Sequence, residues 1–264
     1  MSSTSSPVAI DPLNYSVTLI RMQVRGEAPS QCGVGSATGF FFQDSDRKYL
    51  ITNRHVVIEG EKNFYPDNLL IRIHTSRQSN LPNRDITIPL YDDNNEKLWL
   101  EHTNQEIDVA AIHIDSFLLE NDVVYPFTSQ NIPPSNTILL GVQDNCMVIG
   151  YPLGFCDTVH NLPITRVGAI ASPYGAFFRG QRHFLLDATL HPGTSGSPVV
   201  LPPSRERRII TERGDIVYER REPTYLIGIN SGEYGELGLN AVWYSNIIQE
   251  IISPPPQQQT QPGT

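Results

Sequence analysis

The chain contains few cysteines, no long apolar run and no excess of basic charge. Its three cysteines, Cys32, Cys146 and Cys156, form an odd and sparse set without CxxC spacing, which predicts reduced thiols rather than a disulfide framework. No apolar run reaches the length of about 18 residues that a membrane-spanning helix needs. The first residues carry neither a basic nor an apolar segment, so they do not resemble a secretory signal, and we expect a cytoplasmic protein.

Positive charge is scarce in this sequence. The 264 residues include 19 Lys and Arg against 28 Asp and Glu, which gives a formal net charge of −9. Since affinity for nucleic acids and anionic membranes comes from clustered positive charge, we expect neither as a partner. No spacing of His, Cys, Asp and Glu is typical of a metal site, and no glycine-rich phosphate loop is present. We therefore expect no metal and no cofactor.

Short apolar stretches between turn-forming residues dominate the chain, and helical periodicity is nearly absent. Many of these stretches are rich in Val, Ile, Phe and Tyr, which predicts an all-β sandwich or barrel with antiparallel strands. Only residues 245–252 show an apolar stripe with helical spacing. The predicted strands are 17–24, 38–43, 48–52, 68–74, 86–90, 109–114, 147–150, 163–171, 184–188, 198–201, 209–211, 216–218, 225–230 and 239–244.

Proline and polar residues divide the chain into two β units. Residues 115–137 contain several Pro, Asn and Ser and are interpreted as the connection between them. The C-terminal tail is rich in Pro and Gln and cannot build a core. We expect a flexible N-terminus over 1–12, a first unit over 13–125, a second over 126–252 and a disordered tail over 253–264.

Three segments combine residue types that suit nucleophilic catalysis. His55 follows a predicted strand, and Asp108 opens another. Ser195 lies in a turn between Gly193 and Gly196, and such a turn can present a hydroxyl and direct the amides of Gly193 and Ser195 at one point. Taken alone, the histidine and the aspartate are more readily explained as structural residues. Together they predict a candidate site in the order His, Asp, Ser.

This order resembles that of the trypsin-like serine proteases of the chymotrypsin fold. The resemblance extends over residues 17–252 and is closest to bacterial Deg/HtrA-type protease domains, here without a PDZ domain. It rests on the motifs ITNRHV at 51–56, IDVA at 107–110, VIGYPLG at 148–154, GTSGSP at 193–198 and LIGIN at 226–230.

The resemblance implies two antiparallel six-stranded β-barrels with a short C-terminal helix and an active site between the barrels. His55 and Asp108 would come from the first barrel and Ser195 from the second. His55 would act as general base, Asp108 would orient it, and the amides of Gly193 and Ser195 would form an oxyanion hole. Asp115 and Asp122 are alternative acids, but they follow the strand that Asp108 opens.

The resemblance also implies a pocket for the P1 side chain, which precedes the cleaved bond. Its base would be Thr189, and its walls Asn230, Ser231 and Gly232. Because Thr189 is neutral, we expect a small or medium uncharged P1 residue. Thr194 occupies the position at which zymogen-activated relatives carry an aspartate, so we expect no activation by N-terminal cleavage.

The expected function is therefore that of a serine endopeptidase that hydrolyses protein or peptide substrates through an acyl-enzyme, without a cofactor. Two alternatives stay open. In the first, the peptidase is latent until an activating protein partner orders the loops at 141–146, 172–182 and 231–238. In the second, the chain is a binding module that keeps the protease fold without turnover.

Overall fold

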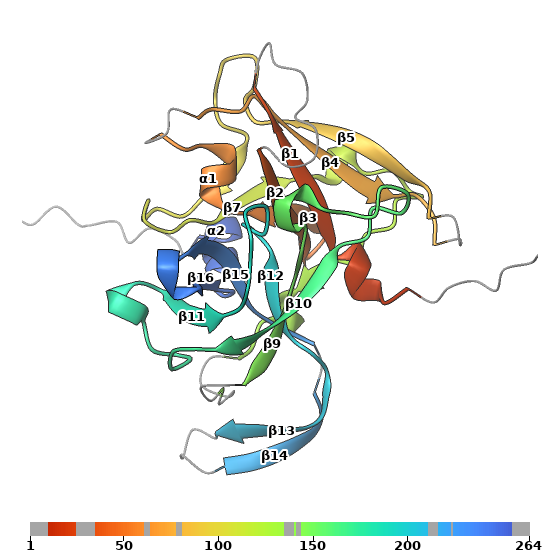
Figure 1. Cartoon of the computed structure of the whole chain (residues 1–264). Coiled ribbons are helices and arrows are strands. Elements are labelled where there is room, and N and C mark those ends of the chain that lie inside the picture. Colours follow the sequence, from red (N-terminus) through yellow and green to blue (C-terminus); the bar gives the residue numbers. More distant parts are fainter. Residues whose placement is uncertain are drawn as a thin grey trace, which may run out of the picture.

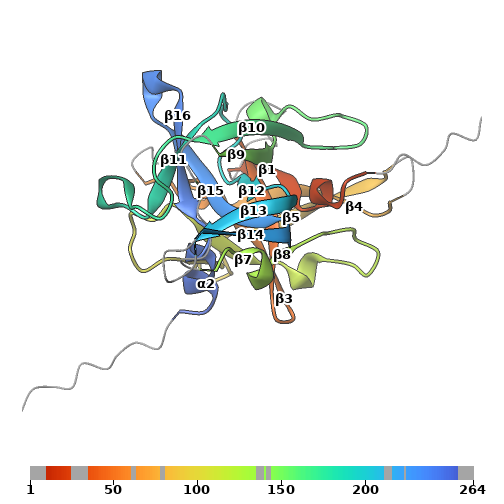
Figure 2. The same cartoon turned by 90° about the horizontal axis from the view of Figure 1, so that it is seen from below.

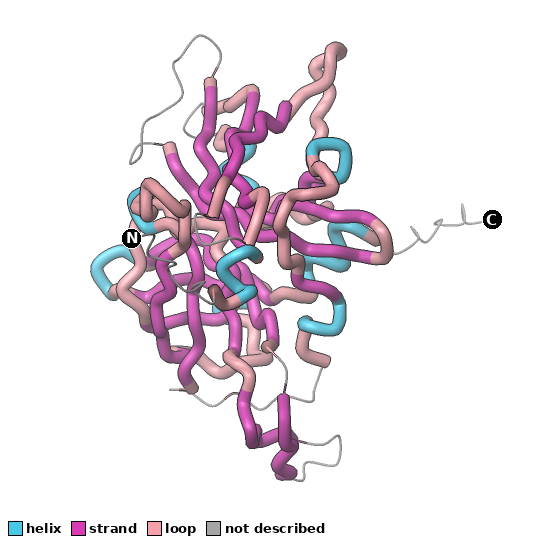
Figure 3. Tube along the Cα trace, turned by 90° about the vertical axis from the view of Figure 1, so that its right-hand side faces the viewer, coloured by secondary structure: helices cyan, strands magenta, loops and turns pink. Residues whose placement is uncertain are grey.

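The computed structural model describes residues 10–24, 35–60, 64–77, 81–134, 140, 144–210, 216–222 and 224–254, and consists mainly of β-strands (Figures 1 and 3). The strands are β1 (Val17–Gln23), β2 (Ser36–Asp44), β3 (Arg47–Thr52), β4 (Asn68–His74), β5 (Asn83–Pro89), β6 (Trp99–Glu101), β7 (Ala110–His113), β8 (Phe127–Thr128), β9 (Asn145–Gly150), β10 (Ile164–Ile170), β11 (His183–Asp187), β12 (Pro198–Leu201), β13 (Ser204–Ile210), β14 (Ile216–Glu222), β15 (Tyr225–Glu233) and β16 (Leu239–Tyr244). The helices are α1 (Arg54–Val57) and α2 (Ile247–Ile252), and the short 3₁₀ turns are η1 (Pro12–Tyr15), η2 (Asp115–Phe117), η3 (Ser129–Asn131), η4 (Pro152–Gly154), η5 (Phe178–Gly180) and η6 (Gly235–Leu237).

The first β unit is an eight-stranded sheet in the order β5-β4-β1-β2-β3-β7-β6, with β8 pairing in parallel to β2. We expected a closed six-stranded barrel here. The two ends of the sheet meet in the connection from β5 to β6. There the amide of Leu98 donates to the carbonyl of Leu90 and the amide of Asp92 donates to the carbonyl of Glu96, both at 3.0 Å, and a bridge pairs Tyr91 with Lys97. The chain turns sharply between these strands around the carboxylate of Asp92, so no continuous ladder closes the sheet.

The second β unit is a closed six-stranded barrel in the order β10-β11-β16-β15-β12-β9, as the resemblance implied. Every neighbouring pair is antiparallel. The hairpin of β13 and β14 leaves this barrel as a separate two-stranded sheet and projects away from it (Figure 1), so that it lies in front of the other strands when the molecule is seen from below (Figure 2). Helix α2 follows β16 and confirms the helix predicted over residues 245–252, although it begins at Ile247 and not at residue 245.

The central strands of the first sheet, β1, β2, β3 and β7, are buried on both faces. In β2, Phe41 belongs to the cluster inside the first unit, whereas Phe40 and Phe42 belong to a cluster shared with the second unit. Successive side chains of a strand point to opposite faces, so a sheet covered on both faces needs apolar residues at every position. This explains the continuous apolar run of β2. A third cluster fills the second barrel.

The shared cluster joins the two units and holds α2 against both. It contains Tyr151 and Trp243 of the second unit together with Ile247, Ile248 and Ile251 of the helix. The carboxylate of Glu250, on the same helix, adds a polar link between the units. The apolar contact therefore holds the two units together.

Glu250 of α2 connects the two units through its carboxylate. It accepts hydrogen bonds from both terminal nitrogens of Arg182 in the second barrel, at 2.5 and 2.6 Å. His102, which follows β6 of the first unit, lies 3.3 Å from the same carboxylate. A bidentate arginine pair of this kind is more specific in direction than a lysine pair.

The boundaries of the two units differ from those expected from the sequence. Strand β8 pairs with β2, so the first unit extends to Thr128 and not to residue 125. At the other end, the carboxylate of Asp11 accepts a hydrogen bond from the amide of Leu13, so the ordered chain starts before residue 13. The expectations for residues 1–9 and 255–264 lie outside the described residues.

The described cysteines agree with the prediction of thiols without a disulfide framework. Cys146 and Cys156 are not joined in a disulfide, and Cys32 lies outside the described residues. Burial in the second barrel raises the pKa of the Cys146 thiol to about 12, so this thiol packs as an apolar group. Among the described helices, none has the length and apolar character needed to cross a bilayer.

We expect the Glu250→Gln substitution to destabilise the protein at neutral pH. Hydrogen bonds from Arg182 hold the pKa of Glu250 below its usual value, against the opposing effect of burial. A carboxyl with a lowered pKa stabilises the fold above its unfolded pKa and loses that contribution as the pH falls through its folded pKa. The loss in unfolding free energy at pH 7 should be about 1 kcal/mol, because solvent screens this partly exposed pair.

Denaturant titrations of the wild type and of Glu250→Gln measure this difference across pH. The difference should shrink as the pH falls from neutral through the lowered pKa of Glu250, because the wild-type carboxyl then becomes protonated. Glu120→Gln is the control, because Glu120 is exposed and has no ion pair in the described chain. A difference that is independent of pH would contradict the assignment.

Candidate active site

His55 lies on α1, a single helical turn that directly follows β3, and Asp108 fixes it in two ways. The backbone amide of His55 donates to Asp108 Oδ1 at 2.8 Å, and the ring Nδ1 lies 2.7 Å from Asp108 Oδ2. Asn53 adds a third link by donating to the carbonyl of Asp108 at 2.7 Å. With Nδ1 paired to a carboxylate, the proton belongs on that nitrogen, and Nε2 is left as the basic one. The structure thus brings together two of the residues predicted from sequence.

Ser231 of the second barrel completes the surroundings of Asp108. Its hydroxyl donates to Asp108 Oδ2 at 2.5 Å. The register between β15 and β16 shifts between Asn230 and Gly232, so Ser231 lies at an irregularity in the strand. Such irregularities redirect side chains, and here one directs a hydroxyl across the boundary between the units. Sequence reasoning placed Ser231 only in the P1 wall and missed this contact with the acid.

Ser195 enters the same hydrogen-bond network through Ser231. Its hydroxyl donates to the carbonyl oxygen of Ser231 at 3.2 Å. Among the described residues, no direct hydrogen bond joins Ser195 to His55. The three predicted residues therefore meet at the junction of the two units, with Ser231 linking Ser195 to the pair of His55 and Asp108.

The amides of Gly193 and Ser195 have no protein acceptor in the part of the chain that the structure describes. The carbonyl of Pro192 accepts from the amide of Leu153 at 2.5 Å, and the carbonyl of Thr194 accepts from Asn230 Nδ2 at 3.0 Å. In a trans peptide the carbonyl and the following N–H point in opposite directions. The two amides consequently point away from these donors, and both can bind an oxyanion.

Glycine is required at both ends of this turn, for conformation and for space. Gly193 has φ +95°, and a Cβ there would lie 2.6 Å from the carbonyl oxygen of Tyr151. Gly196 has φ +82°, and a Cβ there would overlap the carbonyl oxygen of Thr38. Other residues rarely adopt these conformations. The glycines seen in the sequence thus allow the turn to pack closely against its neighbours.

A cavity of ≈ 220 Å³ lies beside Ser195, but its lining differs in part from the predicted pocket. The predicted base, Thr189, is exposed and does not line this cavity. Buried and exposed residues alternate after β11, and Thr189 is the exposed residue between the buried Ala188 and Leu190. Asn240 of β16 lines the cavity instead, which sequence reasoning missed, although a lone polar residue in an apolar strand was a usable signal. The lining consists of Leu190, His191, Pro192, Thr194, Ser195, Asn230, Ser231, Gly232, Glu233 and Asn240.

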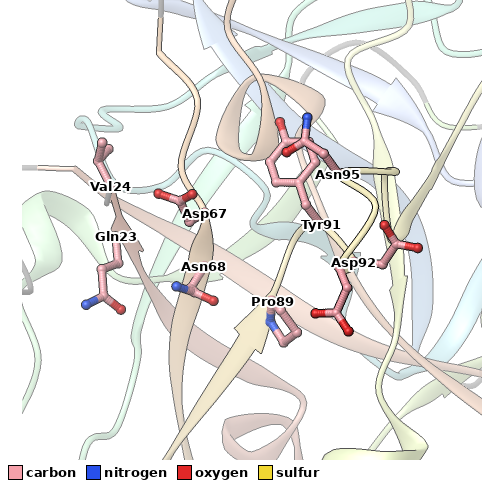
Figure 4. A pocket seen from close by; sticks show the side chains of 9 residues that line it. Gln23, Val24, Asp67, Asn68, Pro89, Tyr91, Asp92 and Asn95 are labelled. Carbon is pink, nitrogen blue, oxygen red and sulfur yellow. The ribbon is translucent and has the colours of Figure 1, made fainter. Parts of the chain in front are cut away.

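A larger cavity, of ≈ 690 Å³, lies at the ends of β1, β4 and β5 and contains none of the predicted residues (Figure 4). Its lining is polar and includes the carboxylates of Asp67, Asp92 and Asp93. Nowhere in the described chain do three or more His, Cys, Asp or Glu residues come together as metal ligands. Since the predicted catalytic serine lines the smaller cavity and not this one, the size of a cavity does not identify the site in this protein.

The two alternative acids are engaged elsewhere. Asp115 accepts from the backbone amide of Lys48 at 2.9 Å and pairs with His113. Asp122 forms a bidentate pair with Arg84. Both acids stabilise loops of the first unit, and their contacts leave Asp108 as the acid beside His55.

The sequence over residues 37–205 matches the trypsin-like peptidase domain family, a stretch that includes all three predicted catalytic residues. The structure is similar to the crystal structure of a scabies mite inactivated protease paralogue, S-I1. The TM-score is 0.53, with 15% sequence identity over 92% of this chain and 96% of that chain. At this identity the likeness shows the chymotrypsin-like fold alone. No curated protein matches the chain.

We expect the Gly193→Ala substitution to displace the turn and lower stability. The new methyl group would face both an unfavourable φ and the backbone of Tyr151 at 2.6 Å. Gly175→Ala is a matched control, because Gly175 has φ +88° and, among the described residues, no atom lies within 4 Å of the place its new methyl group would take. The unfolding free energy should fall by about 1–3 kcal/mol more in Gly193→Ala than in the control. Equal losses in denaturant titrations would show that close packing of the turn does not matter.

Proposed function

Because this chain belongs to the trypsin-like peptidase family, we propose that it is a serine endopeptidase that uses Ser195, His55 and Asp108. The observation that carries the proposal is the 2.7 Å contact between His55 Nδ1 and Asp108, next to a serine turn with two unengaged amides. A fold kept only for binding has no need of this combination. The proposed substrates are proteins or peptides.

In the proposed reaction, His55 Nε2 takes the proton of Ser195 Oγ as that oxygen attacks the peptide carbonyl. The carbonyl oxygen becomes negatively charged and binds the amides of Gly193 and Ser195, each worth on the order of 3 kcal/mol in the barrier. His55 then gives its proton to the leaving amine, and the acyl group stays on Ser195. Water repeats both steps and frees the acid, while Asp108 stabilises the charged imidazole throughout.

The bond between Ser195 and Ser231 is compatible with this reaction. Oγ donates to the Ser231 carbonyl at 3.2 Å, and rotation about the Cα–Cβ bond redirects it. Such rotations are much faster than typical turnover. Catalytic hydrogen bonds in substrate-free enzymes are often made only when substrate binds. We therefore propose that substrate brings the hydroxyl onto His55.

Thr194 supports the proposal that N-terminal cleavage is not needed for activity. This residue is buried, and its hydroxyl donates to the carbonyl of His191 at 2.8 Å. Asn230 holds the carbonyl of Thr194, as described above. Because Thr194 is uncharged and its polar groups are paired, the turn needs no ion pair with a new chain end.

The lining of the smaller cavity supports an uncharged P1 residue of small or medium size. Thr194 and Asn230 contribute neutral walls, and Asn240 Nδ2 donates to the carbonyl of Ala188 at 2.8 Å. That bond fixes the orientation of the Asn240 amide. The carboxylate of Glu233 lines the same cavity and opposes acidic side chains. We propose a preference for a small or medium uncharged P1 residue.

A fluorophosphonate probe tests the proposed nucleophile. The intact mass should show one adduct on the wild type and none on Ser195→Ala, because the probe reacts with an activated serine. Ser129→Ala, a change at an exposed serine, is the matched control and should keep the adduct.

Asp108→Asn should lower the turnover of a peptide substrate by about 10⁴-fold, since His55 then adopts the wrong tautomer.

The alternatives predict a different result in the same experiment. A binding module without turnover, or a peptidase that waits for a partner, would give no adduct on the purified wild type. Labelling that appears only after a partner is added would favour the latent enzyme.

A peptide library tests the proposed P1 preference. Cleavage should occur mainly after small or medium uncharged residues, and Ser195→Ala should give no products. A profile dominated by Arg or Lys would contradict the proposed pocket and would assign the main role to Glu233. The products are read by mass spectrometry.

A further inference from the structure

Thr38 of β2, a residue of the first unit, makes two hydrogen bonds to the serine turn of the second. It is fully buried, at 0% exposure. Its backbone amide donates to the carbonyl of Ser195 at 2.9 Å, and its hydroxyl donates to the carbonyl of Gly193 at 2.8 Å. One residue of the first sheet thus holds the carbonyls of both residues whose amides face the proposed oxyanion.

The hydroxyl of Thr38 also accepts a hydrogen bond, from the amide of Tyr151 at 3.0 Å. Tyr151 precedes η4, in which the amide of Leu153 holds the carbonyl of Pro192 at 2.5 Å. That carbonyl shares a peptide with the amide of Gly193 and sets its direction. The Thr38 hydroxyl therefore links the two segments that orient the Gly193 amide.

Thr52 in turn fixes Thr38. Its hydroxyl donates to the carbonyl of Thr38 at 2.9 Å. Thr38 does not line the cavity beside Ser195, so it does not belong to the P1 pocket. Thr38 therefore acts on the site through its hydrogen bonds to the turn and not by lining the cavity itself.

We propose that Thr38 is a positioning residue that holds the Gly193 amide toward the oxyanion, an inference that rests on the proposed peptidase function. Without its hydroxyl, the buried carbonyl of Gly193 and the amide of Tyr151 lose a shared partner. Buried polar groups without partners are costly, so the turn rotates to find new ones. Since Thr38 belongs to the first unit and the turn to the second, the oxyanion hole is complete only when the units are docked.

The test compares Thr38→Val and Thr38→Ser with Thr18→Val. Thr18 is also fully buried, and its hydroxyl likewise donates to one backbone group and accepts from another, both of Arg72 in β4. Thr18→Val therefore makes the same chemical change away from the serine turn. Each variant is assayed for kcat and KM with a peptide substrate and for the rate of fluorophosphonate labelling.

Thr38→Val should lower kcat and the labelling rate by about 10- to 100-fold, less than the loss of a whole oxyanion donor, with KM changed by less than about threefold. Thr38→Ser restores the hydroxyl and should recover most of the activity. Thr18→Val should keep the wild-type kcat even if its thermal midpoint falls. The Thr38 side chain packs closely against Gly150, so the valine variant could fail to fold. Thr38→Ala has a smaller side chain, serves as a second variant in that case and should show the same loss of kcat.

Two failures are distinguishable. A wild type that neither cleaves nor reacts with the probe would refute the proposed function. An active wild type with unchanged kcat in Thr38→Val or Thr38→Ala, or with an equal loss in Thr18→Val, would refute the role of Thr38 alone.

Discussion

The apolar cluster between the two β units holds together the surfaces that carry the candidate catalytic residues. Phe40 and Phe42 of the first sheet belong to this cluster together with Tyr151, Trp243 and helix α2 of the second unit. Burial of apolar surface is strong and non-directional, so it brings the units together without fixing their register. Asp108 lies between two residues of this cluster, Ile107 and Val109.

Polar contacts across the boundary supply the missing register. Ser231 reaches Asp108, Thr38 reaches the carbonyls of Gly193 and Ser195, and Glu250 lies beside His102. Hydrogen bonds in a buried setting depend strongly on distance and angle, and leaving one unmade is costly. The same bonds that select one docking of the two units therefore also orient the candidate catalytic groups, so fold and chemistry share their determinants.

The serine turn depends on its neighbours as well as on hydrogen bonds of its own, such as that from the amide of Thr194 to the carbonyl of His191. Its peptides are held from outside: by the amide of Leu153, by Thr38, and by the side chain and carbonyl of Asn230. Glycine at both ends permits the close approach of these neighbours. A site built in this way keeps its two amides unengaged because the surrounding carbonyls are already satisfied.

Local patterns along the chain were enough to predict the β class, most strands, the C-terminal helix, the glycine turn and the acid and base, because strand alternation and turn chemistry are local properties. The packing of the whole chain was needed to show that the first sheet stays open, that β8 belongs to it, that Thr189 faces outward and that Asn240 lines the cavity. It also decided the contacts of Ser231 and Thr38, whose partners lie 123 and 155 residues away along the chain. No local pattern encodes such pairs, since they exist only after two separately patterned units have docked on a shared apolar face.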